Sequence, residues 1–425
     1  MDESSSAPLV AAPRPGSDLP LGPSLVARIP GMPLWARLGR WGGDVVGALA
    51  RVVGLGPQLL DPDQVIRMAR FRTGLTELGA VAQPLGLEMA CRSLATDAGL
   101  GGFGRLVVGN ALVEGVSNRL RYVDALARVP QRFDVPLVPP IFVVGLPRSG
   151  TTFLHRLLCA VPGHRGIPLW ESRWPIAGKR DRRRMATAWQ IAMLRGAAPE
   201  VMAKHAFELD SPEEAITMFE ASLGWNPFLW RIAGCHRYVR WLLEQDAEGP
   251  YTAFVDLLRW IAAPTPQHRM VLKTPNHLGY VDLLHALLPD AVFVRTHRDP
   301  AKCIPSYASL SATMHGVSVG KVDKRAIGQT SLHLWTTHAA RAARARAPII
   351  EVAYDDLVAN PLATVTRVFA EAGLPWTSQT RQAVATEVQR RPAGKHGKHI
   401  YSSADFGLTD AEIRARYAAA VDRPG

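Results

Sequence analysis

The chain has 425 residues and a formal net charge of +12, and 47% of its residues are hydrophobic. This length and composition exclude a small disulfide-rich module and are those of an ordinary globular protein with a large core. The excess of positive charge favours anionic ligands or surfaces.

We expect no export signal from the N-terminal residues. Met1 to Ser4 lacks the basic start and apolar stretch of a signal peptide, and no apolar run reaches about eighteen residues. The four cysteines form no Cys-x-x-Cys pair, which argues against a metal site or a disulfide framework. We therefore expect a soluble, cytoplasmic protein without a transmembrane segment. The apolar stretches Ile29–Trp35 and Trp41–Val53 leave peripheral membrane contact open.

Three regions follow one another along the chain. Residues 1–32 are rich in Ser, Pro and Gly and predict a flexible arm. Residues 33–137 predict a helical extension, because apolar residues recur at three- and four-residue spacing between Asp61 and about Arg128. Residues 138–425 predict one further domain, in which the tryptophan-rich section from Glu171 to Trp260 reads as a mainly helical, substrate-facing insertion.

Short apolar runs alternate with helical stretches in that third region. Such alternation is typical of a parallel sheet covered by helices. The predicted fold class is therefore α/β: a parallel sheet flanked by helices, resembling that of P-loop proteins, preceded by the helical extension. The runs are Ile141–Gly145, Met270–Lys273, Ala291–Arg295 and Ile349–Tyr354.

A glycine-bracketed turn follows the first run. Backbone N–H groups of such a loop converge on a phosphate-like anion, and the N-terminus of the next helix adds partial positive charge. The spacing Gly-x4-Gly is that of a nucleotide triphosphate loop, but Thr-Thr stands where Lys-Ser/Thr is expected. The cation lies inside the loop instead, at Arg148. The loop residues are Pro147, Arg148, Ser149, Gly150, Thr151 and Thr152.

Further candidates come after the later strands. Arg298 and Ser306 are eight positions apart, so the end of one strand and the following helix can bring both to one phosphate. Lys273 ends an earlier strand, where a lysine can neutralise negative charge that develops on a leaving group. Tyr354 ends the last predicted strand.

Together these motifs resemble the sulfotransferases that use 3′-phosphoadenosine 5′-phosphosulfate, over about residues 138–407. Pro-Arg-Ser-Gly-Thr-Thr is similar to their 5′-phosphosulfate loop, in the Arg form of the bacterial and tyrosylprotein branches. The resemblance implies that residues 138–425 are the catalytic domain, that Arg298 and Ser306 bind the donor's 3′-phosphate, and that no metal is required. The resemblance also implies that Tyr354 contacts the adenine side of the donor.

The resemblance also implies a late basic loop that closes over the 3′-phosphate. The segment from Arg391 to Tyr401 combines glycine flexibility with several basic or titratable groups. Its candidate donor-binding residues are Lys395, Lys398, His399 and Tyr401.

Three residues are candidates for the general base, and Glu171 is the favoured one. Tyrosylprotein sulfotransferases carry a glutamate shortly after the helix of the phosphosulfate loop, which implies Glu171 here. Cytosolic sulfotransferases place a histidine directly after Lys-Thr, but that position is Pro275, and His277 stands two residues later. His205 is the third candidate. A base within hydrogen-bond reach removes the proton of the acceptor hydroxyl as the sulfuryl group arrives.

The predicted function is sulfuryl transfer to a small-molecule, glycan or lipid alcohol. Two alternatives stay open: a P-loop kinase or NTPase, for which Asp299 is the candidate Mg²⁺ ligand, and a non-catalytic nucleotide-binding protein. Nucleic acid is not expected as a partner, because zinc-finger spacing, an RNA-recognition signature and an aromatic-interleaved basic helix are absent. The sequence contains no heptad pattern, so it predicts no particular oligomeric state.

Overall fold

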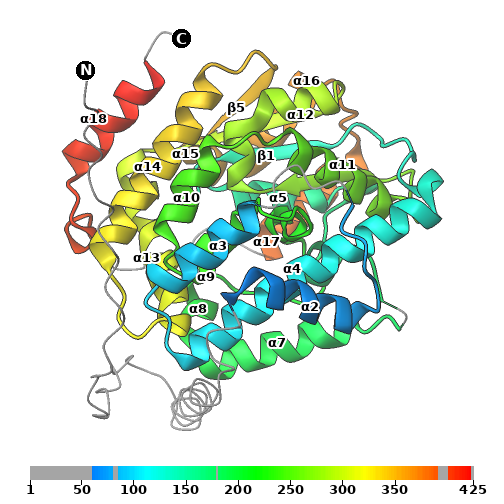
Figure 1. The fold of residues 1–425 in the computed structure, drawn as a ribbon. Coiled ribbons are helices and arrows are strands. Elements are labelled where there is room, and N and C mark those ends of the chain that lie inside the picture. The colour runs from blue at the N-terminus through cyan, green and yellow to red at the C-terminus, as the bar shows by residue number, and fades with distance from the viewer. Residues whose placement is uncertain (1–59, 80–84, 179, 391–400, 423–425) are drawn as a thin grey trace, which may run out of the picture.

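A five-stranded parallel sheet lies at the centre of the molecule (Figure 1). The computed structural model describes residues 60–79, 85–178, 180–390 and 401–422. The strand order is β2-β3-β1-β4-β5, which confirms the predicted α/β class with a parallel sheet. The strands are β1 (Ile141–Gly145), β2 (His164–Arg165), β3 (Arg269–Lys273), β4 (Val292–His297) and β5 (Ile349–Ala353).

The central strands are apolar because helices cover both faces of the sheet. All five residues of β1 are buried. Phe142 and Val144 belong to one hydrophobic cluster, whereas Ile141 and Val143 belong to the cluster on the opposite face. Alternate side chains of a strand point to opposite faces, so a strand buried on both sides appears in sequence as one continuous apolar run. The edge strand β2 has two residues and does not appear as such a run, so the sequence did not predict it.

The face formed by Ile141 and Val143 is covered by α5 (Thr151–Cys159), α16 (Pro361–Glu371) and α17 (Ser378–Arg390), together with Leu357. Their apolar side chains, including Leu157 and Phe369, complete that cluster.

The helices of the N-terminal region lie on the other side. Asp61 caps α2 (Pro62–Thr73) by accepting a hydrogen bond from the backbone N–H of Gln64, and α3 (Leu85–Thr96) and α4 (Gly102–Arg128) follow. Apolar residues of all three join the same cluster as Phe142 and Val144. The boundary at residue 137 therefore stays a prediction, and the predicted arm at residues 1–32 lies outside the described residues.

The remaining helices surround the sheet and lead into the site. Trp225 and Trp230, which suggested a substrate-facing insertion, are 3% and 1% exposed, so core packing accounts for them. No helix in the described part of the chain is long and apolar enough to cross a membrane. These helices are η2 (Pro130–Arg132), α6 (Leu169–Arg173), α7 (Arg183–Ala197), α8 (Pro199–Lys204), η3 (Ala215–Ala221), α9 (Phe228–Ile232), α10 (His236–Glu244), α11 (Glu248–Ala262), η4 (Pro275–Tyr280), α12 (Val281–Leu287), α13 (Pro300–Ser318), α14 (Lys324–Ala343), α15 (Tyr354–Ala359), η5 (Ala404–Phe406) and α18 (Asp410–Val421).

Glu220, in η3, makes the stability of this core depend on pH. Its side chain is buried, and neither carboxyl oxygen has a hydrogen-bond partner among the described residues. Burial raises the pKa of Glu220 to about 7, although Arg173 opposes the shift. The folded protein therefore holds this proton over a pH range in which the unfolded chain has already released it, so the group's contribution to stability falls between about pH 4.5 and 7.

Glu220→Gln is expected to remove that pH dependence. At pH 8 the variant should be more stable than the wild type by roughly 3–4 kcal/mol, since the pKa rises from 4.5 to about 7 on folding and one pKa unit corresponds to about 1.4 kcal/mol. Near pH 4 the two should be nearly equal. Urea unfolding across this range measures the difference, with the exposed Glu77→Gln as the matched control. Parallel stability curves for Glu220→Gln and the wild type would refute the assignment.

Candidate active site

The loop between β1 and α5 has a tightly fixed backbone. Gly145 has a φ of 139°, and a Cβ added there would lie 2.4 Å from the carbonyl oxygen of Thr296 on β4, so only glycine fits. The Ser149 hydroxyl donates a hydrogen bond of 2.6 Å to the Leu146 carbonyl and also contacts the Thr296 hydroxyl at 2.6 Å. These contacts tie the loop to the neighbouring strand.

The second half of the loop leads into a helix N-terminus. Arg148 has a φ of 70°, which is uncommon for a residue other than glycine, and Gly150 has a φ of 95°. α5 begins at Thr151, which is buried, whereas Thr152 is exposed. The free N–H groups and partial positive charge of this nine-residue helix suit an anion.

Residues from three elements converge on Arg148. Its Nε donates to the Ser306 hydroxyl of α13 at 3.2 Å, and its backbone oxygen accepts from Nη1 of Arg298 at 3.0 Å. The Arg298 guanidinium lies 3.9 Å from the ring centroid of Tyr354, at the start of α15. The structure thus brings together the predicted loop, Arg298, Ser306 and Tyr354, and the result is a cationic cluster suited to phosphate groups.

Open space adjoins this cluster. A cavity of about 340 Å³ lies next to the loop, with Arg298 and His297 in its wall. The helices α14 and α18 contribute Ala339 and Tyr417 on the opposite side.

Lys273 ends β3 in a buried ion-pair group. Its side chain is 1% exposed, and its Nζ lies 2.8 Å from Oε1 of Glu214, whose other oxygen pairs with Arg231 of α9. Burial alone would raise the pKa of Glu214, but Arg231 and Lys273 outweigh that effect and hold it well below its usual range. Glu214 is therefore a carboxylate between two buried cations.

The neighbouring glutamate orients His205. Oε1 of Glu213 lies 3.1 Å from Nε2 of His205. Burial would raise the pKa of Glu213, but His205 and Lys273 lower it to about 2, so Glu213 is ionised. A carboxylate only accepts hydrogen bonds, so Nε2 carries the proton and the lone pair of the neutral ring is on Nδ1.

The residue before His205 contacts the loop. The backbone oxygen of Lys204 accepts from Nη1 of Arg148 at 3.5 Å. The ammonium group of Lys204 donates to the hydroxyls of Ser309 and Thr313 on α13, at 2.8 and 2.7 Å. These contacts fix the end of α8, and with it His205, against both the loop and α13.

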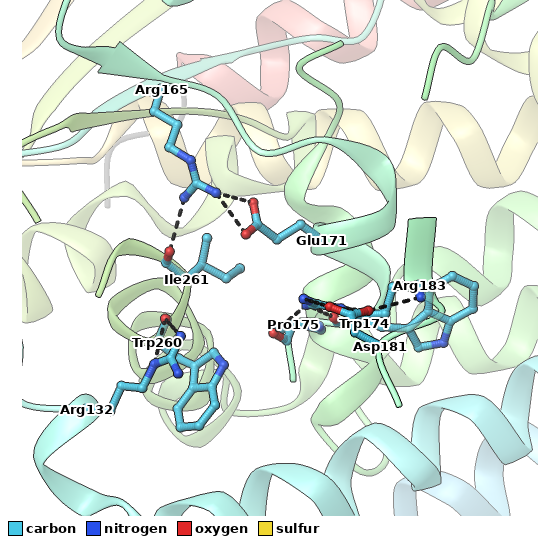
Figure 2. A network of polar contacts seen from close by, with 9 residues as sticks. All are labelled: Arg132, Arg165, Glu171, Trp174, Pro175, Asp181, Arg183, Trp260 and Ile261. Atoms are coloured by element: carbon cyan, nitrogen blue, oxygen red, sulfur yellow. Dashed lines mark hydrogen bonds and ion pairs between the residues drawn. The ribbon is translucent and has the colours of Figure 1, made fainter. Parts of the chain in front are cut away.

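Glu171 points away from this group. Figure 2 shows its carboxylate facing Arg165 of β2, at 2.6 and 2.8 Å, while the same guanidinium donates to the Ile261 carbonyl. The next residue, Ser172, donates its hydroxyl to the backbone oxygen of Glu214, so α6 itself contacts the segment that carries the buried glutamates. Both oxygens of Glu171 are engaged in a bidentate ion pair at the sheet edge, which argues against the predicted role as base.

His277 lies in the aromatic core. Its ring is fully buried and packs edge-on to Phe142, and its Nδ1 is 3.1 Å from the Tyr251 hydroxyl. Burial lowers the pKa of His277 to about 3, which makes the ring a poor proton acceptor at neutral pH. The structure therefore disfavours this candidate as well.

The predicted closing loop is described only at its end. The Tyr401 hydroxyl donates to the Lys302 carbonyl of α13 at 3.2 Å. Lys395, Lys398 and His399 lie outside the described residues.

Sequence reasoning missed Glu213, Glu214 and Arg231. Two adjacent glutamates ordinarily lie in solvent, and their partner Lys273 is 59 positions from Glu214. The one local signal is their position eight and nine residues after His205, just before the apolar segment of η3.

Comparisons with known proteins agree with this geometry. Residues 139–378 match the model of the sulfotransferase family. Curated relatives in Mycobacterium bovis and Mycobacterium tuberculosis, named omega-hydroxy-beta-dihydromenaquinone-9 sulfotransferase Stf3, are 24% identical over 264 residues. The match spans 56% of this chain and 63% of the length of those relatives.

Two solved structures have a similar fold. Sulfotransferase STF1 from Mycobacterium tuberculosis is 29% identical with a TM-score of 0.70, over 84% of this chain and 98% of that one. Sulfotransferase STF9 from Mycobacterium avium is 24% identical with a TM-score of 0.76, over 85% and 95% of the two chains. The family match covers more than half of the sequence and confirms the resemblance seen in the motifs: this chain belongs to the sulfotransferase family.

Proposed function

We propose that the protein transfers a sulfuryl group from 3′-phosphoadenosine 5′-phosphosulfate to the hydroxyl of an acceptor and releases adenosine 3′,5′-bisphosphate. The observation that carries this proposal is the convergence of Arg298, Ser306 and the loop around Arg148 at the start of α5. Two fixed guanidinium groups and a helix N-terminus suit a ligand that carries two separate phosphate groups.

The same residues disfavour a P-loop kinase. The loop lacks the Gly-Lys-Ser/Thr ending. Asp299, the candidate Mg²⁺ ligand, accepts a hydrogen bond from the Ala301 N–H at 3.0 Å and pairs with Arg414 at 2.7 Å. These contacts make Asp299 the N-cap of α13.

In the proposed reaction, His205 is the general base. Nδ1 of His205 takes the proton of the acceptor hydroxyl, and the resulting imidazolium is stabilised by Glu213. The acceptor oxygen bonds to sulfur as the S–O bond to the 5′-phosphate breaks, and that electron pair stays on the phosphate oxygen. Arg148 and the N–H groups of α5 stabilise the negative charge of the leaving group.

The other residues of the site hold the donor and the buried glutamate in place. Arg298 and Ser306 would hold the 3′-phosphate, with Tyr354 stacked on Arg298. Lys273 is buried against Glu214, so we assign it, with Arg231, to holding that glutamate in place. Charge stabilisation on the donor is then the task of Arg148.

For the acceptor we propose a lipid alcohol. The curated relatives act on a hydroxylated menaquinone according to their name. The test is incubation of the protein with donor radiolabelled in the sulfuryl sulfur, together with separate lipid and water-soluble extracts of host cells. Label in a lipid product supports the proposal, label in a water-soluble product overturns the lipid assignment, and consumption of ATP in place of this donor overturns the function.

Arg298→Ala is expected to weaken binding of adenosine 3′,5′-bisphosphate by about 30-fold or more. Truncating one partner of a charged hydrogen-bonded contact costs roughly 2–5 kcal/mol. Binding of adenosine 5′-phosphate, which lacks the 3′-phosphate, should change much less. Isothermal titration calorimetry measures both ligands, and Arg381→Ala, an exposed arginine of α17, is the control. Equal losses for the two nucleotides would contradict a role at the 3′-phosphate.

A further inference from the structure

The helix α7 exposes a stripe of large apolar side chains. Met185, Trp189 and Met193 are 63%, 65% and 42% exposed. They are four positions apart, so they lie on one face of the helix. Among the described residues, they are three of the seven large hydrophobic side chains that are exposed.

This exposure is not a consequence of a loosely packed helix. The opposite face of α7 is buried through Thr187 and Ile191. Figure 1 shows α7 at the lower edge of the molecule. The helix is thus anchored by one face and presents a second apolar face outward, which is the pattern of an interaction surface.

Basic residues flank the stripe along the sequence. Residues 179–197 contain six cationic residues and a single acidic one, Asp181. Asp181 pairs with Arg183, and Arg184 pairs with Asp210. Arg180, Arg182 and Arg195 are exposed, with no ion pair to a described residue. An apolar stripe bordered by arginines is complementary to an anionic lipid surface.

The helix α7 is close to the proposed base along the chain. α7 ends at Ala197, and α8 begins two residues later and ends at Lys204, directly before His205. The Lys204 carbonyl contacts Arg148 of the loop. α7 is therefore followed directly by the helix that ends at the proposed base.

We propose that α7 docks the protein on an anionic membrane surface, with Met185, Trp189 and Met193 in the interfacial layer, and that the acceptor alcohol enters from that membrane. The entry of the acceptor rests on the proposed function; the docking itself does not. Charge disfavours two other partners for this surface, the N-terminal residues of the same chain and a second copy of the protein. Residues 1–59 contain four acidic and five basic residues, and a second copy of the chain carries a net charge of +12.

Vesicle sedimentation with the full chain, in the absence of donor, tests the docking. The wild type should bind phosphatidylcholine vesicles containing phosphatidylglycerol more tightly than pure phosphatidylcholine vesicles, and added salt should weaken binding. Replacing Met185, Trp189 and Met193 together by serine should weaken binding by about tenfold or more, since the inserted apolar area is lost. Phe71→Ser is the matched control, because Phe71 is 91% exposed on α2.

The outcomes separate docking from catalysis. Arg180→Gln combined with Arg182→Gln should weaken binding to the anionic vesicles only. Vesicle binding by the triple variant equal to that of the wild type, or no binding by the wild type, overturns the docking. Self-association of the wild type that the triple variant loses would identify the stripe as an interface between copies, and would also overturn it. Circular dichroism and binding of adenosine 3′,5′-bisphosphate verify that the variants are folded, and failure of that binding in the wild type would refute the proposed function instead.

Discussion

Replacing His205 by alanine is expected to lower kcat by about 10²–10⁴-fold, the usual contribution of a positioned general base. The physical reason is the tautomer that Glu213 imposes, which leaves the lone pair of Nδ1 for the acceptor proton. Binding of adenosine 3′,5′-bisphosphate should stay close to that of the wild type, because His205 is not among the groups assigned to the donor. Transfer of radiolabelled sulfuryl groups and calorimetry of the bisphosphate measure the two quantities separately.

Two further variants distinguish His205 from the other candidates. Glu171→Gln should retain most of kcat, since the carboxylate of Glu171 is paired with Arg165 at the sheet edge. Glu213→Gln should lose part of kcat, and Glu213→Asp should recover some of that loss, as expected of a positioning residue. A collapse of kcat in Glu171→Gln together with an active His205→Ala would return the base role to Glu171.

Glu214→Ala is expected to destabilise the fold by about 3–5 kcal/mol, the cost of leaving buried charges without their partner. The substitution removes the carboxylate between Lys273, 1% exposed, and Arg231, 9% exposed. The low pKa of Glu214 means that this stabilisation is present at neutral pH and is lost only when strong acid protonates the group. Urea unfolding at pH 7 gives the change in free energy.

An exposed pair provides the control for this measurement. Glu371→Ala removes a surface partner of Arg367, where both side chains are more than 40% exposed, and should cost less than about 1 kcal/mol. If Glu214→Ala does not fold, Glu214→Gln should still unfold at a clearly lower temperature than the wild type. A loss in Glu214→Ala no larger than that in Glu371→Ala would contradict the role of the buried group.

The sheet and the anion-binding loop could be predicted from sequence because their signals are local. A strand buried on both faces must be apolar throughout, so Ile141–Gly145 is visible as one run. The loop that follows needs glycine at Gly145, because a side chain there would collide with Thr296. Arg298 and Ser306 come together because a strand end and the helix after it share one edge of the sheet.

The proton-transfer residues depend on contacts that are distant in the sequence. Glu171 has the right position along the chain, but its carboxylate pairs with Arg165 of β2, a strand that is held in the sheet by the distant strand β3. His277 is close to Lys273 in sequence, yet η4 places it in the aromatic core. The pairing that makes Glu214 important joins it to residues 17 and 59 positions away. No spacing rule along the chain reports such pairings.

The central claim is that the site binds a 3′-phosphorylated adenosine nucleotide without a metal. Calorimetric titration of the full chain with adenosine 3′,5′-bisphosphate in the presence of EDTA tests it most directly, with adenosine 5′-phosphate and ATP with Mg²⁺ as comparisons. We predict metal-independent binding of the bisphosphate that is stronger than binding of either comparison nucleotide and is weakened in Arg298→Ala. Binding of ATP that requires Mg²⁺, with no binding of the bisphosphate, would contradict it.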